Sequence, residues 1–275
     1  MPELPEVETI KKQIETYLPF KVSAITTSSF IESIRGGRPK SQFASLKNLV
    51  VSKLIRHGKY LFWFFENTTG AIMVSHLGMS GKWLIDTSDA PLLKHTHLRF
   101  YGKNFTLSYI DPRRFGEIGV LSSSAYTAKL KKLGPDALSP HLNLAYLQEL
   151  FSRYPSRSLK KILLDQTALC GIGNYLASEI MVRAHLLPTR ELASLTPPDI
   201  KNLLRAIKTS INLSIKAQGL TFDGAYRDLH GKAGNTSSSL LVFQQASCGQ
   251  CKKGQKVVRI VQDGRSTFYC KQCQH

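Results

Sequence analysis

The sequence lacks any long hydrophobic run, which argues against a membrane-spanning helix. Its longest dense apolar stretch, residues 60–65, has the length of a buried strand, whereas a spanning helix needs ~18 apolar residues or more. The basic patch and apolar stretch that open a secretion signal are also missing, because the first residues are acidic. No internal repeat is present. We therefore expect a cytoplasmic globular protein.

Acidic residues are scarce. They number 19 against 37 lysines and arginines, which leaves a formal net charge of +18. A surplus of this size attracts polyanions, above all nucleic acid. A basic membrane-binding helix is the alternative, but no segment combines a lysine-rich face with a bulky apolar one. The first ten residues differ from the rest, with three acids and no base. This distribution suits a polyanionic substrate and a carboxyl group that acts as an acid.

Cysteine is rare outside the C-terminal tail, where four of the five cysteines lie. Cys248-x-x-Cys251 is followed by Cys270-x-x-Cys273, a spacing typical of four-thiolate zinc sites. The sequence between the pairs predicts a β-hairpin with its turn at residues 263–264. So short a tail buries too little surface to fold unaided, and structural zinc contributes roughly 10–16 kcal/mol. Two disulfides are the alternative and suit a cytoplasmic chain poorly. We predict one structural zinc.

Apolar periodicity and turn residues divide the chain into two halves. Apolar residues at helical spacing predict a helix over about residues 5–18. The rest of the first half is rich in β-branched and aromatic residues, typical of a β-sandwich or barrel. The expected strands are Val22–Thr27, Leu49–Ile55, Lys59–Glu66, Ala71–Ser75, Lys82–Ile85, His97–Tyr101, Phe105–Ile110 and Gly116–Leu121. The helices expected in the second half are Leu142–Tyr154, Leu159–Gln166, Tyr175–Ala184 and Pro198–Gln218.

The turn before the third of these helices has a distinctive glycine pattern. Gly171-x-Gly173-Asn174 lacks the third glycine of a dinucleotide-binding turn, and no strand precedes it. The pattern instead predicts the turn of a helix–two-turn–helix, whose backbone amides approach a phosphate. The fold class that we predict is therefore α+β, an N-terminal β-sandwich with a leading helix and a C-terminal helix–two-turn–helix domain that ends in a four-cysteine zinc finger. Its expected parts are the sandwich at 1–121, a linker at 122–140, the helical domain with a polar, mobile loop (residues 219–239) at 141–239, and the zinc finger at 240–275.

The opening Met1-Pro2-Glu3 has two interpretations. Proline and acids suit an ordinary helix start, because proline fits the first turn and acids complement the helix dipole. If Met1 is removed, however, Pro2 presents a secondary α-amine. Free α-amino groups have a pKa near ~7.7–8.0, so roughly a tenth or more is unprotonated at neutral pH. Attack of such an amine on a sugar's anomeric carbon gives an iminium, which draws electrons from neighbouring bonds. Taken alone, the segment favours the helix start.

Several short segments, taken together, favour the nucleophilic amine instead. They are Pro2–Thr9, Gly58–Tyr60, His76–Gly81, Asp111–Gly116, Gly171–Asn174 and Gly264–Cys270. In this order they closely resemble the formamidopyrimidine-DNA glycosylases, bifunctional base-excision repair enzymes for oxidised purines. The resemblance runs from residue 2 to Cys273. Leu4 separates the chain from the related endonuclease eight family, which usually has glycine there.

The resemblance implies catalytic roles for four residues. Pro2 is the nucleophile that forms an iminium with the sugar of the damaged nucleoside, and Glu3 is the acid that protonates the ring oxygen as the sugar opens. Lys59 assists β-elimination at the 3′ side. Arg265, on the zinc hairpin, serves δ-elimination and phosphate binding. Glu179 resembles a buried carboxylate near the active centre.

The resemblance also implies a set of DNA contacts. Met79, Arg113 and Phe115 form a wedge that fills the hole left when a damaged base is flipped out of the duplex. The remaining contacts are His95, Lys160 and Asn174. Each has a plainer structural interpretation, such as a solvated surface lysine at positions 59 and 160, or loop and core packing for the wedge.

The implied cofactor is zinc alone, held structurally because four thiolates leave no open position for water. The implied partner is damaged double-stranded DNA, with no membrane partner, and the protein is expected to be a monomer acting at a bacterial nucleoid. Two alternatives stay open: a glycosylase for oxidised pyrimidines with the same lyase step, and a non-catalytic DNA-damage binder.

Three places depart from the family pattern. The zinc loop holds 18 residues between its cysteine pairs, somewhat more than is usual. Residues 242–245 read Val-Phe-Gln-Gln, where the family usually has a run like Val-Tyr-Gly-Arg. Leu220 follows Gly219, where a second glycine is common, in the loop (residues 219–239) that covers the flipped base in the resembling family. These differences bear on the approach of the finger and on base preference, and they leave the metal site intact.

Overall fold

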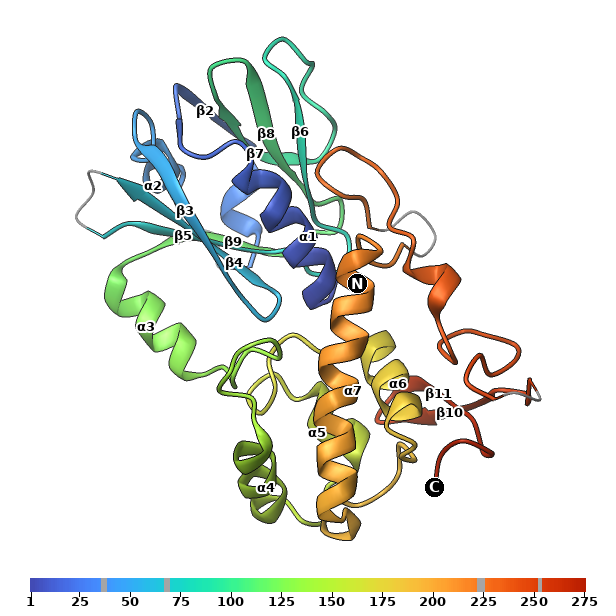
Figure 1. Ribbon diagram of the computed structural model, residues 1–275. Coiled ribbons are helices and arrows are strands. Elements are labelled where there is room, and N and C mark those ends of the chain that lie inside the picture. Colours follow the sequence, from blue (N-terminus) through green and yellow to red (C-terminus); the bar gives the residue numbers. More distant parts are fainter. Residues whose placement is uncertain (36–38, 67–69, 222–225, 252–253) are drawn as a thin grey trace. The chain divides into compact units, whose positions relative to one another are not determined.

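The computed structural model of the protein divides the chain into two compact units (Figure 1). One comprises Met1–Lys131 with Ala217–Asn235, and the other Lys132–Lys216 with Thr236–His275. The structure describes residues 1–35, 39–66, 70–221, 226–251 and 254–275. Within these residues no helix combines the length and the apolar character needed to cross a bilayer.

The first unit is a β-sandwich with a leading helix, as the sequence predicts. One antiparallel sheet has the strand order β1-β3-β4-β5-β9, and the other has the order β2-β7-β8-β6. The strands are β1 (Phe20–Lys21), β2 (Ala24–Thr27), β3 (Val50–His57), β4 (Tyr60–Glu66), β5 (Ile72–His76), β6 (Lys82–Thr87), β7 (Thr96–Tyr101), β8 (Phe105–Ile110) and β9 (Glu117–Leu121). A short helix that the sequence pattern did not predict, α2 (Lys40–Ala44), lies between β2 and β3.

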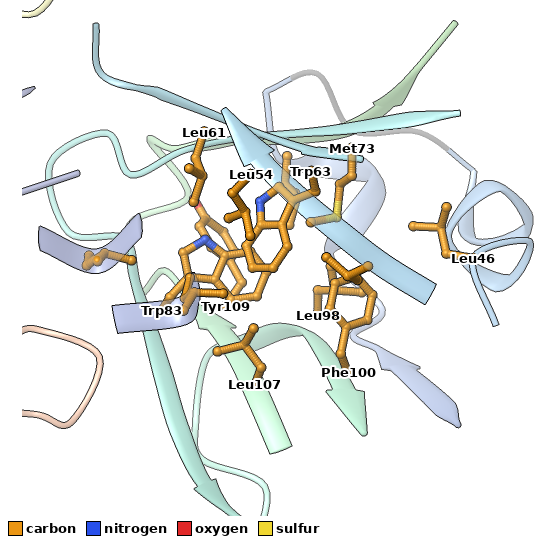
Figure 2. Packing of buried hydrophobic residues seen from close by; sticks show 14 of the residues in the cluster. Leu46, Leu54, Leu61, Trp63, Met73, Trp83, Leu98, Phe100, Leu107 and Tyr109 are labelled. Carbon is orange, nitrogen blue, oxygen red and sulfur yellow. The ribbon is translucent and has the colours of Figure 1, made fainter. Parts of the chain in front are cut away.

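Aromatic side chains hold the two sheets together (Figure 2). Trp63 of β4 and Trp83 of β6 are fully buried, with their ring centroids 4.7 Å apart. Both indole N–H groups donate to Ser75 Oγ at 3.2 Å, so neither buried donor lacks a partner. Phe100 of β7 packs against both indoles. Each such ring removes a large apolar area from water, so this cluster fixes the sandwich on which the loops are mounted.

The leading helix, α1 (Leu4–Glu15), packs on β3 and β4 through an apolar stripe. Its buried side chains include Leu4, Val7, Ile10 and Ile14, at the spacing of one helical face. The helix ends at Glu15, earlier than the predicted residue 18. Pro19 disfavours helical backbone at the residue before it, Leu18. The helix therefore does not continue to residue 18, and the chain leaves it through a turn.

The second unit is helical and ends in a hairpin. Its helices are α4 (Leu144–Arg153), α5 (Leu159–Leu164), α6 (Asn174–Arg183) and α7 (Pro197–Lys216), followed by strands β10 (Val258–Gln262) and β11 (Arg265–Tyr269). A reciprocal capping pair closes the start of α7. Thr196 N–H donates to Asp199 Oδ2 at 3.0 Å, and Asp199 N–H donates to Thr196 Oγ1 at 3.4 Å.

Two segments differ from the expected organisation. Residues 122–140, expected as a linker, contain the helix α3 (Ser123–Lys131). Ser122 caps this helix, because its Oγ accepts from the Ala125 N–H at 3.2 Å. Tyr126 packs its ring against Phe62 and Phe64 at 4.9 and 5.6 Å between centroids. Residues 217–235, expected with the helical part, group with the sandwich. The four-part division itself stays a prediction.

Candidate functional site

The predicted nucleophile and acid lie at the start of α1. Pro2 and Glu3 are buried, whereas Met1 is exposed and precedes Pro2 in the chain. Glu3 is the N-cap residue, and its N–H donates to Glu6 Oε2 at 2.6 Å. The capping box therefore fixes the backbone that carries Pro2 and Glu3. The two interpretations of the N-terminus, a helix start and a nucleophilic amine, are therefore compatible. The predicted helix start also supports the candidate nucleophile.

Glu6 connects this helix start to the segment after α7. Its Oε1 accepts a hydrogen bond of 2.7 Å from the Leu220 N–H. Gly219 has a φ of +86°, and a Cβ there would lie 2.9 Å from Glu6 Cγ, so a side chain is excluded. The role of Glu6 was not predicted from the sequence. The available signal was its place at the third helical position, where glutamate completes a capping box.

A second link holds the same segment farther along α1. Gln13 Nε2 donates to Asp228 Oδ2 at 2.8 Å, and Leu229 N–H donates to Gln13 Oε1 at 2.9 Å. Tyr226 and Leu229 are buried in the core of the sandwich unit. The expectation of a mobile loop over residues 219–239 is therefore wrong for residues 226–235, because apolar side chains within the polar stretch anchor it. Residues 222–225 lie outside the described part of the chain.

Lys59 lies in the tight turn between β3 and β4 and is 6% exposed. Arg56 joins this turn to the leading helix. Its Nε donates to Glu8 Oε2 of α1 at 2.7 Å, and its Nη1 donates to the Gly58 carbonyl at 3.0 Å. This largely buried ion pair fixes the turn that carries Lys59 relative to the helix that carries Pro2 and Glu3. Neither Arg56 nor Glu8 was identified from the sequence as a link, because the pairing is tertiary.

His76 lies beside Lys59 and is held in its neutral form. It pairs with Tyr60 across the sheet, and its Nδ1 accepts a hydrogen bond of 3.0 Å from the Gly78 N–H. Burial, with a smaller contribution from the charge of Lys59, lowers the pKa of His76 from 6.5 to about 3. Because the folded-state pKa is below the unfolded one, the unfolded chain binds more protons between these values. The contribution of neutral His76 to the unfolding free energy is therefore fully present above pH 6.5 and is lost as the pH falls toward 3.

We expect the His76→Asn variant to lose less stability in acid than the wild type. Asparagine retains an acceptor near the position of Nδ1 but does not titrate. Each pKa unit corresponds to about 1.4 kcal/mol, so the difference in unfolding free energy between pH 7 and pH 4 should shrink by ~2–3 kcal/mol. Urea titrations at the two pH values measure it. The exposed His141, changed to Asn, is the control, and an equal effect there would contradict the assignment.

Asp111 organises the loops that carry the predicted wedge. Its Oδ1 accepts from Ser80 Oγ at 2.6 Å, and its Oδ2 accepts from the Gly116 N–H at 2.8 Å. The Asp111 N–H in turn donates to the carbonyl of His95 at 3.1 Å. The buried Asp111 thus joins the loop before β6 and the turn before β9 through its carboxylate, and the loop before β7 through its backbone N–H. Asp111 belongs to one of the matching sequence segments, but its structural role was not predicted.

The predicted wedge residues are exposed side chains on these loops. Met79 is 42% exposed and Phe115 is 53% exposed, and the Arg113 guanidinium lies 4.5 Å from the centroid of the Phe115 ring. His95 is also exposed and has a φ of +63°. Exposed apolar side chains held on a rigid frame are able to enter a base stack. The core-packing alternative for Phe115 therefore loses support.

In the second unit, the predicted contacts gather around one carbonyl group of the hairpin. Asn174 Nδ2 and Lys160 Nζ donate to the carbonyl oxygen of Ser266, at 3.0 and 3.3 Å. Lys160 also bonds to Thr267 Oγ1 and is 1% exposed. Burial lowers the pKa of Lys160 to about 8, with a smaller contribution from the nearby Arg265 charge. Lys160 is thus buried and is not a solvated surface lysine. Its role as a phosphate contact stays a prediction.

Arg265 follows the hairpin turn and is exposed. β10 and β11 pair from Val258–Tyr269 to Gln262–Arg265, so Asp263 and Gly264 form a two-residue turn. Both have positive φ values, +50° and +72°, as a type I′ turn requires. The predicted hairpin and its turn are confirmed.

Gln166 fixes the turn between α5 and α6. Its Nε2 donates to the carbonyls of Leu164 and Ile172, and its Oε1 accepts from the Gly171 N–H. This is the reason that α5 ends at Leu164 and not at Gln166 as predicted. The side chain replaces backbone hydrogen bonds that the turn cannot make itself.

The four tail cysteines converge on one point. Their Sγ atoms, from Cys248, Cys251, Cys270 and Cys273, all lie within 4.8 Å of one another, and all four are free thiols. A tetrahedral zinc with Zn–S bonds of about 2.3 Å requires sulfur atoms about 3.8 Å apart, so this donor set fits zinc. Four sulfur ligands leave no site for water. The predicted structural zinc is confirmed, and the disulfide alternative is not.

Glu179 anchors the segment that leads into the finger. Its carboxylate accepts hydrogen bonds from the N–H groups of residues 241, 242 and 243 at 2.8, 2.9 and 3.0 Å. Burial raises the pKa of Glu179, and these backbone donors oppose the rise. The next residue, Gln244, has a φ of +57°. The position where glycine is usual in the resembling family is therefore left-handed here and carries a side chain.

We expect Gln244→Gly to stabilise the protein by ~0.5–1 kcal/mol, because left-handed backbone is costly for a residue with a Cβ. Gln244 is exposed, so little packing is lost. Gln148→Gly, within α4, should instead destabilise by about 1 kcal/mol. Unfolding free energies in urea provide the comparison. A fall in stability for Gln244→Gly would show that its side chain has a stabilising contact.

Three family patterns match the chain. They are the formamidopyrimidine-DNA glycosylase N-terminal domain over residues 1–118, the formamidopyrimidine-DNA glycosylase H2TH domain over 133–224, and the zinc finger found in FPG and IleRS over 254–275. The formamidopyrimidine-DNA glycosylase of Prochlorococcus marinus strain NATL2A is 34% identical over 284 residues, covering 100% of both proteins.

Solved structures agree with these matches. A Lactococcus lactis FPG variant in complex with Fapy-dG-containing DNA is 27% identical with a TM-score of 0.88, covering 99% of each chain. The wild-type Lactococcus lactis FPG in complex with DNA containing an oxidised pyrimidine is 28% identical, with a TM-score of 0.87 and the same coverage.

Proposed function

Because the chain belongs to the formamidopyrimidine-DNA glycosylase family of base-excision repair enzymes, we propose that it removes oxidised purines and then cleaves the abasic strand. The observation that supports this most is the arrangement at α1. Pro2 and Glu3 lie at its capped start, and Arg56 ties the Lys59 turn to Glu8 of the same helix. A nucleophile, an acid and an amine are thus mounted on one rigid part of the sandwich unit.

The first step is displacement of the base. The unprotonated Pro2 nitrogen forms a bond to C1′ as the glycosidic bond breaks, and the damaged base leaves with the bonding electrons and takes up the proton that the nitrogen loses. Glu3 gives a proton to the ring oxygen as the sugar opens, which leaves the iminium on C1′. A positioned acid of this kind contributes typically ~10²–10⁴-fold to the rate.

The iminium then drives strand cleavage. It makes the C2′ proton acidic, and loss of that proton expels the 3′ phosphate in the β-elimination that Lys59 assists. A second elimination expels the 5′ phosphate, where the Arg265 guanidinium stabilises the leaving charge. Zinc takes no part in these steps and holds the hairpin that carries Arg265.

Duplex DNA is the proposed partner of both units. The wedge would fill the place of the flipped base. The carbonyl of Ser266, bound by Lys160 and Asn174, fixes the hairpin beside the glycine-rich turn, whose backbone amides suit a phosphate. A net charge of +18 supplies the general attraction to the strand.

Borohydride trapping tests the covalent step. Reduction of an iminium leaves a stable bond between protein and DNA, so a trapped species of the combined mass is expected with an 8-oxoguanine duplex. A non-catalytic damage binder would give none. The intact mass of the purified chain must also lack Met1, because an acylated proline nitrogen cannot attack.

A glycosylase for oxidised pyrimidines is the second candidate, since a structurally similar FPG is bound to such DNA. The chemistry would be the same. Excision rates on 8-oxoguanine and thymine-glycol duplexes separate the two, and a faster reaction on thymine glycol would reverse the order.

A further inference from the structure

We propose that Phe30 and Arg114 form a second pair of DNA contacts beside the wedge, in which the ring packs against the duplex that flanks the lesion and the guanidinium binds a backbone phosphate. This inference rests on the proposed function, because it assumes that the wedge enters damaged duplex DNA. Neither residue belongs to the contacts that the family resemblance implies.

The pair reproduces the chemistry of the wedge. Phe30 is 55% exposed, and the Arg114 guanidinium lies 5.1 Å from its ring centroid. In the wedge, Arg113 lies 4.5 Å from the centroid of Phe115, which is 53% exposed. Two successive arginines of one turn are therefore each stacked on an exposed phenylalanine. Proteins that bind exposed bases combine aromatic faces, on which the bases stack, with cations that neutralise the phosphates.

A continuous set of hydrogen bonds fixes the Phe30 turn to the wedge turn. The Phe30 N–H donates to Ser28 Oγ at 3.2 Å, and Ser28 Oγ bonds to Nδ1 of the buried His97 at 2.9 Å. His97 Nε2 bonds to the carbonyl of Asp111 at 3.0 Å. A carbonyl only accepts, so Nε2 carries a proton, and in the neutral imidazole Nδ1 then accepts from the serine hydroxyl. Every donor in this series of hydrogen bonds has an acceptor. Phe30 is thereby positioned on the frame that carries the wedge.

Arg114 has a left-handed backbone conformation that residues other than glycine rarely adopt. Its φ is +57°, which costs a non-glycine residue on the order of 1–2 kcal/mol. Its Nη1 donates to Ser33 Oγ at 3.3 Å, and within the described ranges no carboxylate forms an ion pair with it. Backbone strain of this kind concentrates at functional sites. The arrangement presents a cation that is oriented but not neutralised, as a phosphate contact requires.

Double-stranded DNA fits this surface better than a protein partner. The pair presents an aromatic ring and a guanidinium, and Arg113 and Phe115 of the wedge belong to the same turn as Arg114. The simpler alternative is that the stacked pair only joins residues 28–33 to the wedge turn. That alternative predicts an effect on stability and none on DNA binding.

Binding to a duplex with a stable abasic-site analogue tests the stacking contact. Phe30→Ala should weaken binding by about 5- to 150-fold, because base–aromatic stacking is worth ~1–3 kcal/mol. Phe30→Leu should bind almost as weakly, since leucine keeps apolar packing but has no π face. Leu213→Ala, which removes an exposed apolar side chain of α7 in the other unit, should bind as the wild type does.

Salt dependence tests the phosphate contact. The slope of log Kd against log salt should fall by about one for Arg114→Gln, the amount expected for one lost phosphate contact. Arg153→Gln, on the exposed face of α4, should leave the slope unchanged. Unchanged affinity of Phe30→Ala together with an unchanged slope for Arg114→Gln would overturn the proposal. Borohydride trapping of Phe30→Ala at saturating concentration distinguishes this failure from a failure of the proposed function. Trapping persists if only the proposed Phe30–Arg114 contact is wrong, and it is absent if the protein is not a glycosylase with a lyase step.

Discussion

Pro2→Gly is expected to bind damaged duplex DNA with near wild-type affinity and to lose base excision. Glycine at the N-terminus keeps an amine but loses the ring that makes it secondary and holds it at the capped start of α1. The remaining primary amine is a weaker and less firmly held nucleophile, and we expect its excision rate to fall by on the order of 10³-fold or more. Single-turnover excision of 8-oxoguanine, with binding measured on an abasic-analogue duplex, separates the two effects.

Pro5→Ala is the matched control for this variant. Pro5 also lies in the first turn of α1 and is buried, so its loss perturbs the same helix start without changing the terminal amine. We expect Pro5→Ala to retain excision within a few-fold, and its borohydride-trapped complex to form as usual. Excision by Pro2→Gly at the wild-type rate would refute the proposed nucleophile.

Cys270→Ser is expected to release the zinc and to abolish tight DNA binding. Serine is a poor zinc ligand, and a site with three thiolates loses much of the ~10–16 kcal/mol that binding contributes to folding of the finger. The β10–β11 hairpin then loses its support, and Arg265 and the Ser266 carbonyl move with it. Zinc content by mass spectrometry, hydrogen exchange of residues 258–269, and affinity for an abasic-analogue duplex are the measurements.

Cys170→Ser is the matched control for the zinc variant. Cys170 is a buried thiol of the same unit but lies outside the cysteine cluster. It should retain zinc and hairpin protection even where the core is weakened. If Cys270→Ser bound DNA with full affinity, the zinc-supported hairpin would not be a contact surface.

Local patterns were enough to predict much of the fold. The strand β8 and the turn at residues 263–264 were predicted at their observed positions, because alternation and a two-residue Asp-Gly turn are local properties. The helix α3 was missed because serine-rich composition hides a helix whose apolar side, at Tyr126, packs on a strand distant in sequence. The end of α5 was misplaced because the Gln166 side chain closes the turn.

The candidate site divides in the same way. The identities of Pro2, Glu3, Lys59 and Arg265 came from short motifs, and their catalytic roles stay predictions. The residues that position them were not visible in the sequence. Arg56 reaches Glu8 across 48 positions of the chain, and Glu6 reaches Leu220 across 214. No local pattern carries pairings of such separation.

By itself the sequence determined the family, the zinc ligands, the charge that favours DNA, and most strands and helices. Each depends on residue type and short-range spacing, which the chain carries whatever its fold. Only the tertiary structure decided that Lys160 is buried against β11, that residues 226–235 pack on the sandwich unit, and that Phe30 is tied through His97 to the wedge turn. Buried polar groups need hydrogen-bond partners, and only the folded chain determines which groups distant in sequence lie close enough to be those partners.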